Sequence, residues 1–119
     1  PMNRRCLEIR NADSACNLYL GLAATIAAGL DGLEREADPG PPINVDTYKS
    51  TKEELNAMGV HRLPVHLGAA LAAFASDDLV KGALGKEFAE HYRAYKEAEW
   101  IEYSTVVDRW EVDKYLKVW

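Results

Sequence analysis

Charged and apolar side chains alternate at the start of the chain and then give way to an uncharged stretch. Residues 5–10 read Arg-Cys-Leu-Glu-Ile-Arg, and this alternation predicts a β-strand because successive side chains of a strand point to opposite faces. Residues 18–30 carry no charge, and their leucine and isoleucine residues recur at helical spacing. A helix that is apolar on nearly all sides is expected to be buried on nearly all sides. The opening therefore predicts one short strand and then a buried helix, with Asp13 and Ser14 as candidate N-caps.

The remainder of the chain predicts helices separated by turns. Residues 37–50 contain three prolines and a glycine, which indicates an extended loop. The sequence Thr51-Lys-Glu-Glu54 has the pattern of a capping box, so a short helix should begin there and end near Gly59. Periodicity and capping residues predict further helical segments at residues 66–76, from 77 or 78 to 84, at 86–103 and at 108–116. The chain is thus expected to be mainly α, with one short N-terminal β-strand.

A single strand needs a partner, because its backbone N–H and C=O groups must find hydrogen bonds if they are buried. Two explanations remain open. The strand could pair with a second copy of itself, or its sheet could lie in polypeptide outside these 119 residues. The apolar helix favours the second explanation, because one small helical layer can hardly cover every side of it.

Composition excludes some functions. The net charge of −5 argues against nucleic acid as a partner, since phosphate binding requires a basic face. The uncharged run is shorter than the roughly 20 apolar residues that cross a membrane. Cys6 and Cys16 form no disulfide framework and no C-x-x-C motif, which favours small core thiols and a cytoplasmic location. The length suits a single domain covering residues 1–119, and its Pro-Met start indicates either an internal beginning or a remnant of cloning.

Few residues are candidates for chemistry. The three histidines lack metal-ligand spacing and are interpreted as structural or solvated. Glu8 and Arg10 lie two apart on the predicted strand, so both side chains should leave the same face. A carboxylate beside a guanidinium suits a site for a divalent cation and an anionic substrate. From composition alone, a surface ion pair on an edge strand is the simpler interpretation.

Short motifs follow one another in chain order, from Glu8 and Arg10 through Asn17-Leu18-Tyr19-Leu20 and Asp38-Pro39-Gly40 to Trp110-Glu111. Together they resemble the end of the glutamine synthetase catalytic domain. The family typically has an R-x-E-x-R strand, an A-N-P-Y-L helix start, A-A-G-L-D-G-I, a D-P-G-x-P loop and a closing E-W…V-x-x-W-E-x-x-x-Y-L. Another segment is similar to the branch that holds type III-like glutamine synthetases and γ-glutamylmethylamide synthetases. The matching segments are residues 7–10, 14–20, 27–32, 38–42, 55–64 and 99–116.

The resemblance implies a fold, an activity and two site residues. The chain would be the helical C-terminal portion, about a quarter, of a catalytic domain whose sheet is built mostly by other residues. The parent would be an ATP-dependent ligase that joins glutamate to ammonia or a small amine through γ-glutamyl phosphate, and it would form a homo-oligomer. Glu8 would ligate Mg²⁺ or Mn²⁺, and Arg10 would bind the glutamate substrate. No residue of this chain is assigned a catalytic role, and the chain alone is expected to be inactive.

Two positions depart from the family pattern. Cys6 stands where the first arginine of R-x-E-x-R is expected, and Arg5 would point to the opposite face unless the strand bulges. Leu18 replaces the proline of A-N-P-Y-L, which a helix start tolerates. The first departure keeps an alternative open, in which the chain is a non-catalytic helical interaction module that diverged from the family.

Overall fold

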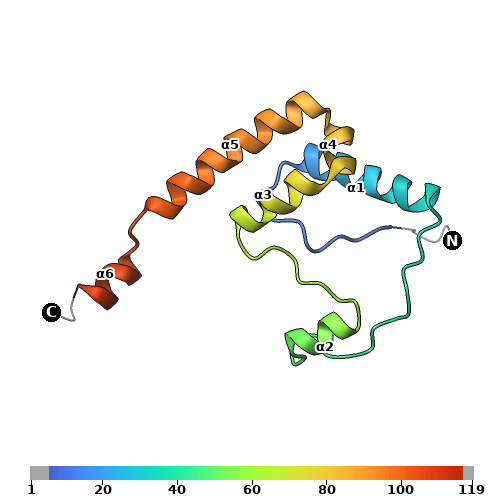
Figure 1. Ribbon diagram of the computed structural model, residues 1–119, viewed down its shortest axis with the longest axis horizontal. Coiled ribbons are helices and arrows are strands. Elements are labelled where there is room, and N and C mark those ends of the chain that lie inside the picture. The colour runs from blue at the N-terminus through green and yellow to red at the C-terminus, as the bar shows by residue number, and fades with distance from the viewer. Residues whose placement is uncertain (1–5, 117–119) are drawn as a thin grey trace.

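The computed structural model describes residues 6–116, and helices dominate this range (Figure 1). The prediction of a mainly α chain is confirmed. In chain order the helices are α1 (Leu18–Glu34), α2 (Lys52–Ala57), α3 (Leu67–Ser76), α4 (Asp78–Leu84), α5 (Lys86–Thr105) and α6 (Arg109–Tyr115).

The predicted N-terminal strand is wrong for the part of it that the structure describes. Residues 6–10 form neither strand nor helix, and Arg5 lies outside the described residues. The physical reason is the lack of a partner strand among the described residues. A strand is held by hydrogen bonds to a neighbouring strand, and none is found between residues 6 and 116.

Local capping sets where the helices begin, and one of the expected caps is wrong. Asn17, and not Asp13 or Ser14, is the N-cap of α1: its Oδ1 accepts the N–H groups of Tyr19 at 3.0 Å and Leu20 at 3.2 Å. Asp13 instead accepts the N–H of Ala15 at 2.7 Å and so closes a turn ahead of the helix.

The capping box expected at the start of α2 is confirmed. The Thr51 N–H donates to Glu54 at 2.8 Å, and the Glu54 N–H donates to the Thr51 hydroxyl at 3.2 Å. Gly59 follows the end of α2 with a φ of +73°, a conformation that glycine adopts without the steric cost of a side chain. The local signals of this segment therefore predicted both of its ends.

Four helices pack together. α4 contacts α1, α3 and α5, and α3 also contacts α5. Gly85, with a φ of +86°, turns the chain between α4 and α5, and α5 then runs away from the cluster (Figure 1). Leu71 of α3 and Ala89 of α5 are buried at this packing. Among the described residues, α2 and α6 pack against no other helix.

The contact of α3 with α5 is closest at Gly68 and Trp100. A Cβ at position 68 would lie 2.7 Å from Nε1 of the Trp100 indole, so only glycine allows this approach. The His66 ring stacks on the same indole with a centroid separation of 5.0 Å and an interplanar angle of 9°. His66 also caps α3, because its Nδ1 accepts the N–H of Ala69 at 3.1 Å.

The chain is far more open than a self-contained domain of its size. Its radius of gyration is 18.9 Å, whereas a compact domain of this length has about 13.5 Å. Its accessible surface is 10875 Å², against about 6,450 Å² for a folded protein of this mass. No residue of α1 is buried, so the expected burial of that helix is wrong for this chain. The reason is geometric: α4 covers one side of α1, and no second layer covers the other.

Candidate functional site

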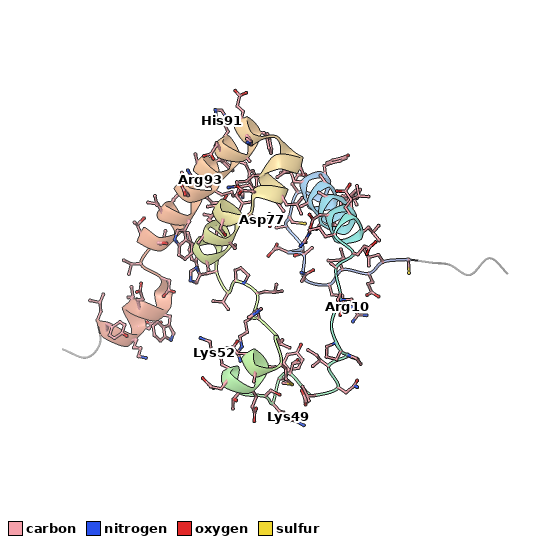
Figure 2. The ribbon with its side chains drawn as sticks, turned by 45° about the vertical axis from the view of Figure 1, so that its right-hand side comes forward. Arg10, Lys49, Lys52, Asp77, His91 and Arg93 are labelled. Carbon is pink, nitrogen blue, oxygen red and sulfur yellow. The ribbon has the colours of Figure 1, made fainter. Side chains whose placement is uncertain are left out.

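Glu8 and Arg10 lie in the segment that precedes α1, and they form an ion pair with each other. The Arg10 Nε–H donates to Oε1 of Glu8 at 2.7 Å. The side chain of Glu8 is 67% exposed and that of Arg10 is 85% exposed. Figure 2 shows Arg10 on this segment, away from the packed helices. The sequence-predicted pair is thus brought together, in the form of the exposed ion pair that was the simpler interpretation.

The chemistry available at this pair is limited by its exposure. An exposed pair such as this contributes on the order of 0.2–1 kcal/mol, so either side chain can be released to a ligand at small cost. Mg²⁺ prefers six oxygen ligands in near-octahedral geometry. The described residues hold no group of three or more His, Cys, Asp or Glu side chains that could bind a metal. Glu8 therefore fits the role of one carboxylate ligand, and the others would have to come from elsewhere.

The remaining predicted candidates have structural surroundings. His66 caps α3 and stacks on Trp100, and the His91 Nδ1 lies 2.8 Å from the carbonyl of Glu87, one turn earlier in α5. The interpretation of these two histidines as structural is confirmed. Cys6 and Cys16 are free and exposed, so their interpretation as core thiols is wrong for this chain. The Cys16 sulfur would lie only 3.8 Å from a Cβ at Gly21, which places it against the first turn of α1.

Perturbed pKa values belong to ion pairs on helix surfaces. Glu97 raises the pKa of Arg93 most strongly, and a hydrogen bond to Glu90 adds to the effect. A hydrogen bond to Glu99 raises the pKa of Lys96. These residues are spaced three or four apart on α5, where neighbouring turns bring opposite charges together. The ion pairs therefore stabilise the helix, and the pKa shifts that they cause do not indicate a catalytic group.

A charged cavity between α4 and α5 was not singled out from the sequence. It encloses 480 Å³ and is lined by Asp78, Lys81, Lys86 and Glu90. Lys81 donates to the Ala75 carbonyl at 2.7 Å and pairs with Asp78 at 2.9 Å, which lowers the pKa of that carboxyl. Lys86 and Glu90 are four positions apart on α5, a spacing that allows an ion pair, but none joins them among the ion pairs of residues 6–116. The two positive and two negative side chains leave the cavity with no net charge, so it resembles a solvated junction.

The comparisons with known proteins decide the family. Residues 1–115 match the sequence model described as glutamine synthetase, catalytic domain. The chain belongs to the glutamine synthetase family. No helix in residues 6–116 combines the length and the apolar character needed to cross a membrane.

Relatives in the family carry two different names. The chain is 44% identical over 110 residues to a glutamine synthetase from Halobacterium salinarum, covering 92% of this chain and 24% of that protein. It is also 44% identical over 111 residues to a glutamate–methylamine ligase from Methyloversatilis universalis, covering 93% of this chain and 25% of that protein.

A solved structure supports the fold of the chain. Apo GmaS without ligand matches with a TM-score of 0.72 and 38% identity, over 87% of this chain and 24% of that one. The chain thus spans about a quarter of the length of the relatives that it matches. The family resemblance read from the short motifs is confirmed.

Proposed function

We propose that this chain is the helical C-terminal part of an ATP-dependent ligase that joins glutamate to ammonia or a small amine. The observation that carries the proposal is the family match over residues 1–115, which includes both Glu8 and Arg10. The names of two relatives, glutamine synthetase and glutamate–methylamine ligase, favour ammonia or a small amine as the nitrogen donor. In this proposal residues 1–119 form a single domain, and the protein is a cytoplasmic homo-oligomer.

The proposed reaction has two steps. An oxygen of the glutamate side-chain carboxylate attacks the γ-phosphorus of ATP, and ADP leaves, which forms γ-glutamyl phosphate. The nitrogen of ammonia or an amine then attacks the acyl carbon, phosphate leaves, and the nitrogen loses a proton to give the amide. Both steps gather anionic groups in one place, so carboxylate ligands, divalent metal and arginine are needed together.

Within this scheme Glu8 and Arg10 have separate roles. Glu8 would be one ligand of Mg²⁺ or Mn²⁺, and the metal would neutralise charge on the phosphates when bound. Arg10 would hold a glutamate carboxylate through its planar guanidinium, which matches a carboxylate in two hydrogen bonds. Their weak mutual ion pair is compatible with this, because each partner can exchange the other for a ligand.

The chain alone is proposed to be inactive, because one carboxylate ligand cannot organise the metal, ATP and glutamate. Incubation of the 119-residue chain with ATP, glutamate, Mg²⁺ and ammonia should release no phosphate above the background without protein. Clear turnover would overturn this part of the proposal and leave the family assignment intact.

The role of Glu8 is tested in the longest reading frame that contains this sequence. Glu8→Ala should lower metal-dependent amide formation by at least about 100-fold, because a preorganised charge contact to the reacting groups is lost. Arg10→Lys should raise the KM for glutamate more than the KM for ATP. Glu53→Ala is the matched control, since Glu53 is an exposed carboxylate on a different element, α2. Activity of Glu8→Ala equal to that of Glu53→Ala would contradict the assignment.

One observation favours a second candidate, a non-catalytic interaction module. Cys6 is exposed and occupies the position of the first arginine of the family's R-x-E-x-R pattern. If the complete protein makes no amide with ammonia or methylamine, and Cys6→Arg restores none, the module is the better description. An unrelated domain upstream in the reading frame would favour it as well.

A further inference from the structure

We draw no further inference here: the strongest candidate, the charged cavity between α4 and α5 that is lined by Asp78, Lys81, Lys86 and Glu90, carries none because its charges balance, the described residues place no buried polar side chain in it, and nothing in the structure shows what covers it.

Discussion

Gly68 allows the closest approach between two helices of the cluster, and replacing it by alanine should destabilise the chain. An added Cβ would lie 2.7 Å from Nε1, 2.8 Å from Cε2 and 3.2 Å from Cζ2 of Trp100. The indole is a rigid ring that also stacks on His66, so it cannot move aside without losing that contact. Overpacking of this kind costs about 1–3 kcal/mol. Alanine in place of glycine in a helix returns about 1 kcal/mol, so the net loss should be about 1 kcal/mol at the middle of this range.

Gly29→Ala is the matched control for this substitution. Gly29 lies inside α1, and an added Cβ there meets no atom within 4 Å. It should stabilise the chain by about 0.5–1 kcal/mol through helix propensity alone. The two variants should therefore differ by about 2 kcal/mol, or roughly 1 M in the urea midpoint for a chain of this size. Urea unfolding followed by circular dichroism at low micromolar concentration measures this difference.

Two results would contradict the expected clash at position 68. A urea midpoint of Gly68→Ala at or above that of the wild type would show that the approach of α3 to α5 is not tight. A double-mutant cycle with Trp100→Leu locates the clash, because Gly68→Ala should become neutral or stabilising once the indole is gone. A cost that persists in the Trp100→Leu background would place its origin outside this contact.

Two further predictions follow from single residues. Glu36 follows α1 with a φ of +50°, and its N–H and that of Ala37 close the helix on the carbonyls of Leu33 and Gly32; Glu36→Gly should therefore raise the free energy of unfolding by about 1 kcal/mol, measured by urea unfolding, and a loss would contradict it. The pKa of Asp78 is lowered chiefly by its hydrogen bond to Lys81, so its stabilising contribution is complete above the ordinary aspartate pKa near 4 and is lost as the pH falls through the lowered value. The difference in stability between wild type and Asp78→Asn should accordingly shrink below about pH 4, and a difference that stays constant from pH 7 to pH 3 would refute this cause.

Short-range chemistry made much of this chain predictable. The capping box of Thr51 and Glu54, a start of α4 at residue 77 or 78 and the glycine after α2 were all expected from residues within four positions of one another. Of the two aspartates, Asp77 is the N-cap of α4. The pairing of Glu8 with Arg10 belongs to the same class, since it follows from a spacing of two along an extended segment. Helix starts, turns and neighbouring ion pairs depend on hydrogen bonds and contacts between residues close in the sequence, so they can be predicted from the sequence. The choice of Asn17 over Asp13 shows the limit, because both residue types cap helices well and each accepts backbone N–H groups two residues further along the chain.

Burial and strand pairing required the three-dimensional arrangement. The alternation in residues 5–10 and the uncharged run in residues 18–30 predict surfaces that need a partner, but they do not say whether the partner is present. The structure shows that residues 6–10 have no neighbouring strand and that large apolar side chains of α1, such as Tyr19 and Leu33, remain exposed. The close approach of Gly68 to Trp100, 32 positions apart in the sequence, could not be foreseen either. Such contacts join residues distant in the chain, and their free energy depends on where the other layer lies, which no local pattern of side chains encodes.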